Sequence, residues 1–446
     1  MASNKFIIRS NIKNLIIKLK QSSFLKNIFI VMSGTAIAQF ITYALSPIIS
    51  RLFTPEDFGI FGSFSAVTGI IGALLTLDYS QASMLPKENH DAINLFCLSI
   101  ITTVIITFIA SAISIIKPSI FYNLTRTRGL GYLLLFFITL LIAGINQASQ
   151  AWAVRSKAFN RTSTSQIIRS IGSSGSRILL GFMKTGSFGL IISNAFANLL
   201  ASINLFQILI PDLKSMRSNI NLRMMKSLAK EYLDFPLFSA SQNFLNAISS
   251  GLPVLLITKY YGLHAAGAYA FGLTILQAPM SLVLTALRQV LFQKACEFQH
   301  KGQKILLLYI RTVIVLFVIA FIPSIILFIW APQVFTIIFG AQWQLAGILA
   351  RSLIIWMLFV FCNLPAIIFS RIIRIQRFVF FYDLVLLAAR TFTLIIGGIH
   401  FKLTQTVMVF AIVGALMNIY LIYFVGKQVA KKENMKYSLI LIDLLN

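Results

Sequence analysis

Long apolar segments follow one another along almost the whole chain, separated by short polar connections. A helix that crosses a membrane needs about 20 mostly apolar residues. Twelve segments meet this requirement, which predicts an all-α integral membrane protein with about 12 transmembrane helices. The expected spans are 28–50, 58–84, 92–116, 131–154, 163–183, 186–210, 235–258, 266–292, 304–330, 345–370, 378–399 and 403–426.

Four of these spans, the first, second, seventh and eighth, carry polar residues at spacings of three and four positions. Such spacing places each polar set on one face of its helix. Small hydroxyl residues also allow membrane helices to pack closely, so helix packing and a water-filled cavity both explain the Ser and Thr positions. For the amide side chains a cavity is the favoured interpretation; these are Gln39, Gln242, Asn246 and Gln277.

A short pattern occurs twice, 208 residues apart. Segments 51–61 and 259–269 both read basic-x-aromatic-x5-Gly-x-aromatic, and each follows the first span of one half of the chain. Six spans separate the copies, so both halves cross the membrane in the same sense. We interpret the pattern as a duplication, and parallel repeats of this kind bind substrate between the halves in transporters.

The composition agrees with a membrane protein, because 58% of the 446 residues are hydrophobic and 11% are charged. The charge is strongly basic, with 38 Lys and Arg against 12 Asp and Glu. The even-numbered loops and the two terminal segments carry 25 of the basic residues and the odd-numbered loops carry 7. The positive-inside bias therefore predicts that both termini are cytoplasmic. Because this bias accounts for the basic charge, no nucleic-acid partner is expected.

The longest loop divides the chain into six spans plus six. The expected organisation is a basic segment 1–27, a six-helix bundle 28–210, a cytoplasmic linker 211–234, a second bundle 235–426 and a cytoplasmic tail 427–446. Residues 1–27 fit an amphipathic helix on an anionic membrane surface, and equally a plain basic tail.

Six arginines lie inside the expected spans: Arg169, Arg177, Arg288, Arg311, Arg351 and Arg390. If all six faced lipid at mid-bilayer, the cost would be about 15–20 kcal/mol, more than the net stability of a typical protein. Arg311 and Arg351 lie near span ends, where a long side chain reaches the membrane surface. Arg169, Arg177 and Arg288 are the best candidates for residues that line a cavity.

Intramembrane acids are fewer than these arginines. Asp78 lies in the second span, and Asp383 lies in the eleventh, two turns before Arg390. Each aspartate either balances a buried arginine or takes up a coupling proton or sodium ion. The positive excess favours an anionic substrate, and the planar fork of arginine suits phosphate oxygens.

No residue pattern supports an enzyme. The chain has no glycine-rich phosphate loop, no Ser-His-Asp set and no paired carboxylates. The cysteines, Cys97, Cys296 and Cys362, have neither disulfide nor zinc spacing. We expect no cofactor and no metal centre.

Several motifs together resemble the membrane proteins of bacterial polysaccharide biosynthesis, the oligosaccharide repeat-unit (O-antigen) flippases of the Wzx type. The resemblance depends on the order and spacing of motifs over most of residues 30–400. They are 33–39 (SGTAIAQ), 51–59 (RLFTPEDFG), 82–87 (ASMLPK), 92–95 (AINL), 267–269 (GAY), 278–280 (APM), 292–295 (FQKA), 339–343 (FGAQW) and 346–347 (AG).

This resemblance implies a fold and a task. Relatives belong to the multidrug/oligosaccharidyl-lipid/polysaccharide exporter superfamily, with two six-helix bundles in a V related by a pseudo-two-fold axis (MATE-like). Their substrate is an undecaprenyl-diphosphate-linked oligosaccharide, moved from the cytoplasmic to the outer leaflet of the bacterial inner membrane by alternating access. The cavity arginines would hold the diphosphate. Candidate partners are membrane lipid, a polysaccharide polymerase and a chain-length regulator. At 78–84 the chain departs from the family pattern, so Asp78 as a coupling residue does not follow from the resemblance.

Three alternatives remain open. One is an ion-coupled drug exporter of the same fold, which the arginine excess disfavours. Another is a membrane polymerase or ligase, which the short odd-numbered loops disfavour because they leave no room for an active site. The third is a scaffold in a polysaccharide assembly complex.

Overall fold

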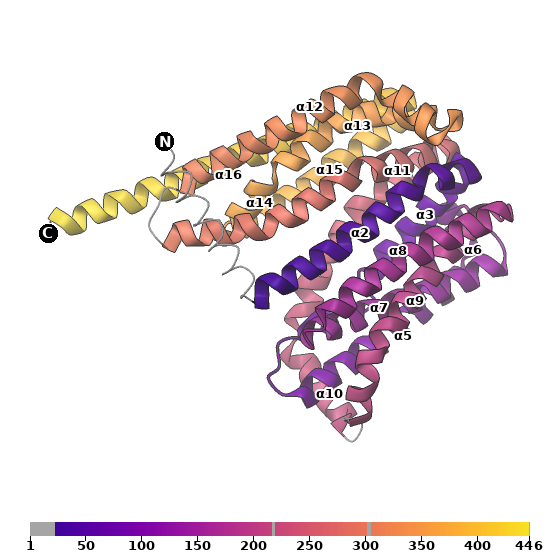
Figure 1. Ribbon diagram of the computed structural model, residues 1–446, viewed down its shortest axis with the longest axis horizontal. Coiled ribbons are helices and arrows are strands. Elements are labelled where there is room, and N and C mark those ends of the chain that lie inside the picture. Colours follow the sequence, from indigo (N-terminus) through magenta and orange to yellow (C-terminus); the bar gives the residue numbers. More distant parts are fainter. Residues whose placement is uncertain (1–22, 216–218, 301–304, 446) are drawn as a thin grey trace, which may run out of the picture.

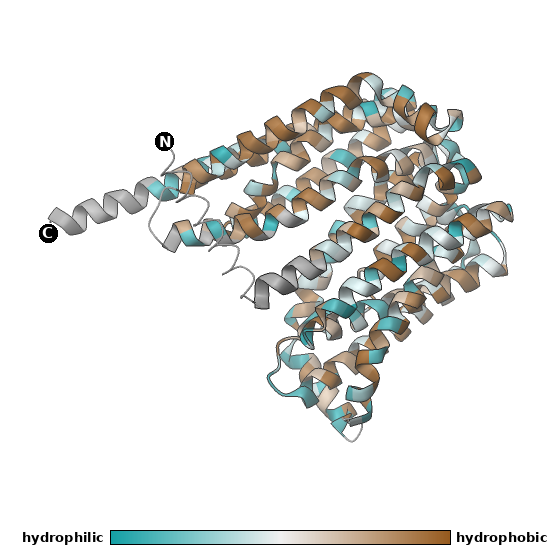
Figure 2. Ribbon diagram, viewed as in Figure 1, coloured by the Kyte–Doolittle hydropathy of each residue, from teal (hydrophilic) through white to brown (hydrophobic). Residues whose placement is uncertain are grey.

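The computed structural model describes residues 23–215, 219–300 and 305–445. Most of the expected N-terminal segment 1–27 lies outside these residues. In these residues the chain is helical apart from short turns, and its helices form two bundles that meet at one end and diverge toward the other (Figure 1). Hydrophobic residues run along the outer helices, whereas hydrophilic residues gather at the ends of the bundles (Figure 2).

The N-terminal half consists of eight helices. They are α2 (Ser23–Leu52), α3 (Pro55–Gly72), α4 (Tyr79–Ala82), α5 (Asn89–Ile116), α6 (Pro118–Thr125), α7 (Leu130–Arg155), α8 (Phe159–Phe182) and α9 (Gly186–Ser215). A short amphipathic helix, α10 (Leu222–Glu231), and a π-helical turn, η2 (Phe235–Ala240), lead to the C-terminal half.

The C-terminal half begins with a 60-residue helix, α11 (Ser241–His300). It continues with α12 (Ile305–Phe339), the 3-10 turn η3 (Ala341–Trp343), α13 (Gln344–Cys362), α14 (Leu364–Ile372), α15 (Gln376–His400) and α16 (Leu403–Leu445). Gly262, with φ 84° and ψ 178°, interrupts α11 and divides it into two crossings. Glycine adopts this backbone conformation without the steric cost of a Cβ atom.

Nine helices of the described residues are long and apolar enough to span a membrane, and one of these includes both crossings of α11. The other two crossings are α3, which begins with Glu56 and Asp57, and α8, which is the more polar of the two. Together they give about twelve crossings in two bundles, so the predicted fold class is confirmed.

The second expected span, 58–84, is not one continuous helix. It ends at Gly72, and the chain turns through Leu77 (φ 45°) and Asp78 (φ 60°) before α4. Backbone groups that such a break frees inside a membrane need partners from neighbouring helices. Gln147 of α7 supplies one, since its side-chain amide donates to the carbonyl of Gly72 at 3.1 Å.

The two halves meet where α2 turns into α3, and we call this end the closed end. Thr54 caps α3 in a reciprocal capping box with Asp57, and Pro55 occupies the first turn. Phe58 then packs edge-on against Trp343, with ring centroids 5.1 Å apart. The indole Nε1 of Trp343 also donates to the carbonyl of Ser50 at 2.8 Å, which joins the C-terminal half to α2.

The two copies of the repeated motif cross each other at the closed end. A Cβ atom on Gly59 would lie 2.1 Å from the carbonyl oxygen of Leu263, and one on Gly267 would lie 1.7 Å from that of Pro55. Positions 59 and 267, and positions 55 and 263, are equivalent at the 208-residue offset. The contact is therefore reciprocal, as expected at a pseudo-two-fold axis. Both positions require a residue without a side chain.

Replacing Gly59 by Ala should weaken the closed end. The added methyl group meets backbone that cannot move aside, and overpacking of this kind typically costs about 1–3 kcal/mol. Gly69→Ala is the matched control, because Gly69 lies on the same helix with open space around its Cα. Thermal unfolding of the purified variants measures the difference. Equal unfolding temperatures for the two variants would show that the glycine contact is not needed.

Candidate functional site

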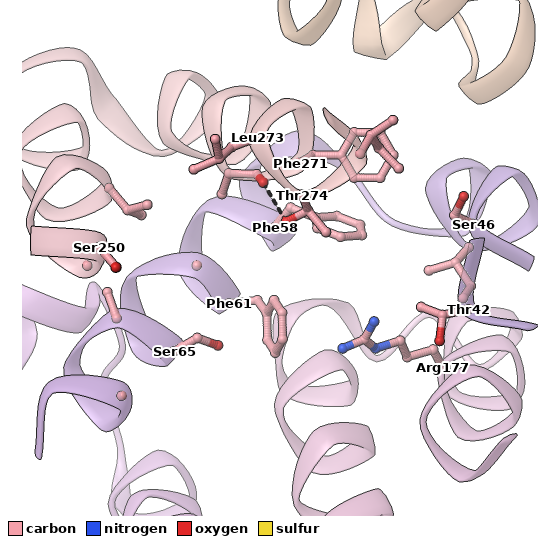
Figure 3. Close-up of a pocket in the computed structure, with 18 of the residues that line it drawn as sticks. Thr42, Ser46, Phe58, Phe61, Ser65, Arg177, Ser250, Phe271, Leu273 and Thr274 are labelled. Atoms are coloured by element: carbon pink, nitrogen blue, oxygen red, sulfur yellow. Dashed lines mark hydrogen bonds between the residues drawn. The ribbon is translucent and has the colours of Figure 1, made fainter. Parts of the chain in front are cut away.

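A cavity of about 440 Å³ lies between the halves, next to the closed end. Helices α2, α3 and α8 line it from one half and both crossings of α11 line it from the other (Figure 3). Its wall combines aromatic rings with hydroxyl groups. Those labelled in the figure are Phe58, Phe61, Phe271, Thr42, Ser46, Ser65, Ser250 and Thr274. The volume is within the usual range for small-molecule sites.

Arg177 of α8 is the charged residue in this wall. Its guanidinium lies 5.1 Å from the centroid of the Phe61 ring, toward which it points in Figure 3. Its Nε is buried without a hydrogen-bond partner. In the part of the chain that the structure describes, both ion pairs involve histidine, and neither includes Arg177. A cation held beside aromatic rings and neutral hydroxyl groups, without a counter-ion, favours an anionic ligand.

The other expected arginines of the cavity lie outside this wall. Arg169, two turns before Arg177 on α8, is exposed. Arg288 of α11 is also exposed, and it shares a helical face with Ser281. Ser281 is hydrogen-bonded to Gln39 of α2, with the amide Nε2 3.2 Å from the hydroxyl. Gln277 is exposed one turn before Ser281. Gln39 therefore bridges the two halves, and Gln277 and Arg288 lie on the face of α11 that this bridge orients toward α2.

A second pocket of about 40 Å³ lies between the first crossing of α11 and α15. Asp383 of α15 lines it together with Gln242 and Asn246, both on α11. Two amides expected to line a cavity thus meet an aspartate expected to serve ion coupling or charge balance. A carboxylate with two amide oxygens nearby provides ligands of the kind that hard cations prefer.

Asp78 lies at the break between α3 and α4. Its left-handed backbone is uncommon for a residue other than glycine, although aspartate tolerates it better than most. Its carboxylate accepts a hydrogen bond of 3.2 Å from the side chain of Asn243, across the boundary between the halves. Asp78 is therefore a half-buried acid at a helix break, and it contacts both bundles.

Arg390 is enclosed by aromatic rings. Only 8% of its surface is exposed, and its guanidinium lies 4.0 Å from the ring centroid of Trp356 and 4.1 Å from that of Phe410. The described ion pairs include neither Arg390 nor Asp383. Stacking between two rings stabilises a desolvated guanidinium by about 2 kcal/mol or more.

Sequence reasoning missed a polar contact at the closed end. Glu56 accepts a 2.7 Å hydrogen bond from Nδ1 of His264, and these residues occupy equivalent positions of the repeat. Partial burial acts to raise the pKa of Glu56, but the hydrogen bond and charge of His264 outweigh it, and the net pKa lies below the ordinary value. The 208-residue offset was the available signal, because residues near a two-fold axis face their own equivalents.

Solved structures share this architecture. Lipid II flippase MurJ in an inward closed conformation aligns with a TM-score of 0.70 and 13% identity, over 92% of each chain. An outward-facing multidrug resistance MATE family transporter of the MOP superfamily aligns with a TM-score of 0.58 and 14% identity, over 91% of this chain and 96% of its own. At these identities the likeness defines the fold, which is that of multi-pass membrane transporters.

The sequence itself identifies the family. Residues 48–347 match the polysaccharide biosynthesis protein family, and the chain belongs to that family. The predicted resemblance to membrane proteins of polysaccharide biosynthesis is thereby confirmed. No curated protein matches the sequence.

A double-mutant cycle should separate the two roles considered for Arg390. Arg390→Lys keeps the charge but loses the planar stacking surface, so it should couple with Trp356→Leu by about 1–2 kcal/mol in the free energy of unfolding. Its coupling with Asp383→Asn should stay below about 0.5 kcal/mol, since the groups form no ion pair. Detergent-titration unfolding of the variants measures both values. The opposite order would make charge balance by Asp383 the role of Arg390.

The closed end should loosen in acid. The pKa of Glu56 is lowered in the closed arrangement. Ionised Glu56 therefore stabilises closure at any pH above the ordinary pKa of a glutamate, and this contribution is lost as the pH falls through the lowered pKa. Spin labels at two exposed positions, Lys184 in the N-terminal half and Lys402 in the C-terminal half, report the distance between the halves by double electron–electron resonance spectroscopy. We expect a longer-distance population on acidification in the otherwise native protein and a flat response in Glu56→Gln. Identical pH responses would contradict a role for Glu56.

Proposed function

We propose that this protein is a flippase that moves undecaprenyl-diphosphate-linked oligosaccharide repeat units from the cytoplasmic to the outer leaflet of the bacterial inner membrane. The product would serve O-antigen or another surface polysaccharide. Membership of a polysaccharide biosynthesis family on a transporter fold supports the task. A polymerase and a chain-length regulator are the partners expected to receive the flipped unit.

The observation that carries this proposal is Arg177. It presents an unpaired cation to a cavity between two pseudo-symmetric halves, which is where a transporter of this architecture binds its substrate. A diphosphate supplies the missing negative charge, and the guanidinium fork matches its oxygens. A 440 Å³ cavity accommodates the diphosphate end of such a lipid rather than the whole molecule.

The distribution of basic residues supports an orientation. If the termini and even-numbered loops are cytoplasmic, the closed end faces outward and the diverging ends of the bundles face the cytoplasm. In this state the halves 28–210 and 235–426, joined by the linker 211–234, would admit substrate from the cytoplasm. Breaking the closed-end contacts would then expose the cavity outward, which is alternating access.

The remaining polar residues receive secondary roles in this proposal. Arg169 and Arg288, with Gln39 and Gln277, would guide the diphosphate and sugars along the polar face between the halves. Gln242 and Asn246 with Asp383 would bind a coupling ion, and Asp78 would respond to it at the boundary. Arg390 would keep the nearby helices in register through its ring contacts.

Three other functions predict different outcomes in a strain that lacks the protein. An ion-coupled drug exporter predicts drug sensitivity with normal polysaccharide. A polymerase or ligase predicts single repeat units that already face outward. A scaffold predicts that no cavity variant loses activity. The unpaired arginine disfavours a pocket for cationic drugs.

Arg177→Gln should abolish translocation. Removing a buried charged hydrogen-bond donor from a bound anion typically costs 2–5 kcal/mol, which is a rate loss of about 30-fold or more. Arg177→Lys keeps the charge without the fork, so partial activity is expected. Outer-leaflet labelling of undecaprenyl-diphosphate-linked oligosaccharide in spheroplasts measures the rate.

The matched control is Arg161→Gln. Arg161 lies on the same helix but outside the cavity, where it donates to Gln207. The Arg161→Gln variant should translocate the lipid-linked oligosaccharide at the normal rate when its abundance equals that of the unaltered protein. Normal translocation by Arg177→Gln would remove Arg177 from the site, and outward-facing lipid-linked sugar in the strain that lacks the protein would end the flippase proposal altogether.

A further inference from the structure

Another large cavity, here called the α6 cavity, lies at the closed end of the N-terminal half, outside the proposed translocation site. It measures about 540 Å³ and is formed by α6 and the loop that follows it. Tyr122, Asn123, Arg128 and Leu133 are among its lining residues. None of them lines the cavity that contains Arg177.

Segment 117–129 carries three cations, Lys117, Arg126 and Arg128, and Arg128 lines the α6 cavity. The guanidinium of Arg128 stacks 3.9 Å from the ring centroid of Tyr122, and that of Arg126 lies 5.8 Å from the same centroid. Segment 117–129 contains no acidic residue. The two acids at the start of α3 are engaged elsewhere, Glu56 with His264 and Asp57 in the capping box. The three positive charges therefore have no acidic partner in the described part of the chain.

The backbone fixes these cations in position. Phe121 is 6% exposed and packs against Phe136 with ring centroids 5.2 Å apart, so one face of α6 is anchored in the core. Arg126 then ends the helix in the left-handed conformation, with its N–H bonded to the carbonyl of Tyr122 at 2.7 Å. This turn brings the side chains of residues 126 and 128 back over Tyr122.

The surface beside the cations is apolar. Ile116 and Leu130, at the two ends of the segment, are 74% and 70% exposed, and Ile120 on α6 is 45% exposed. In a membrane protein such side chains face acyl chains, and an aromatic ring beside basic groups is typical of headgroup level. This loop also carries three of the seven basic residues in the odd-numbered loops, against the general charge bias of the chain.

From the cations, the ring and the apolar border together we infer that α6 and the loop 126–129 form a binding site for an anionic glycerophospholipid, whose phosphate lies on Arg126 and Arg128. The acyl chains extend along Ile116, Ile120 and Leu130. A phosphate group complements the three charges, and the apolar border selects a lipid over free phosphate. The site is independent of the proposed flippase activity.

The test measures retention of phosphatidylglycerol by the purified full-length protein in detergent, by native mass spectrometry with phosphatidylcholine as the uncharged comparison. Each basic side chain near an anionic lipid contributes about a five-fold gain in affinity, so Arg126→Gln with Arg128→Gln should lower retention about 30-fold. Lys184→Gln is the matched control, because it removes an exposed charge at the same end without an aromatic partner. It should change retention less than about two-fold.

Two further variants distinguish this lipid site from a general attraction of positive charge and from the translocation cavity. Tyr122→Leu keeps all charges and should give an intermediate loss, because Arg128 then lacks its stacking surface. Arg177→Gln should retain phosphatidylglycerol normally even where translocation is abolished, so failure of one proposal is distinguishable from failure of the other. Equal retention of the two lipids, or normal retention by the double arginine variant, would overturn the site. Displacement by excess inorganic phosphate, with the phosphate itself retained, would make free phosphate the ligand and overturn the lipid assignment.

Discussion

The structure depends on the close approach of two backbone segments at the pseudo-two-fold axis. Gly59 meets the carbonyl of Leu263 and Gly267 meets that of Pro55, so small residues at equivalent positions let α3 and α11 approach each other closely. In a membrane, where apolar side chains gain little by leaving lipid, such close packing is a main source of helix association. Phe58, Phe271 and Trp343 pack against one another beside this crossing, mostly edge to face. The cavity that contains Arg177 lies directly beside this crossing, and α3 and α11 form part of its wall.

This arrangement explains why three intramembrane arginines have different environments. Arg390 is desolvated, but two aromatic faces compensate its charge within one bundle. Arg177 has one ring and an open cavity, so part of its compensation is left to a ligand. Arg288 lies exposed on the face of α11 that approaches α2 near Gln39. All three residues are arginines. The number of side chains that the fold places against each guanidinium therefore distinguishes a structural arginine from one that is available to bind a ligand.

Sequence patterns predicted the fold class, the approximate spans and the family, because apolar length and motif order are local properties. They also indicated Arg177 as a cavity residue, although Arg169 and Arg288 had equal claims. Choosing among the three requires knowing how α8 and α11 rotate against their neighbours, and that rotation is fixed by contacts between distant residues such as Ser170 with Thr42. The break at Leu77 and Asp78 was missed for the same reason. It is held by Gln147 and Asn243, and neither is near it in sequence.

The repeat carries one more constraint. Residues close to a two-fold axis face their own equivalents, so an unchanged duplicate would place Glu opposite Glu or His opposite His. Two carboxylates at that distance would repel, whereas Glu56 with His264 forms a 2.7 Å hydrogen bond. Backbone symmetry at Gly59 and Gly267 is thus accompanied by chemical asymmetry one turn earlier. Closure is consequently a property of both halves at once, since neither half contains the complementary pair alone. The Glu56–His264 contact therefore lies where the two halves share a backbone path but differ in chemistry.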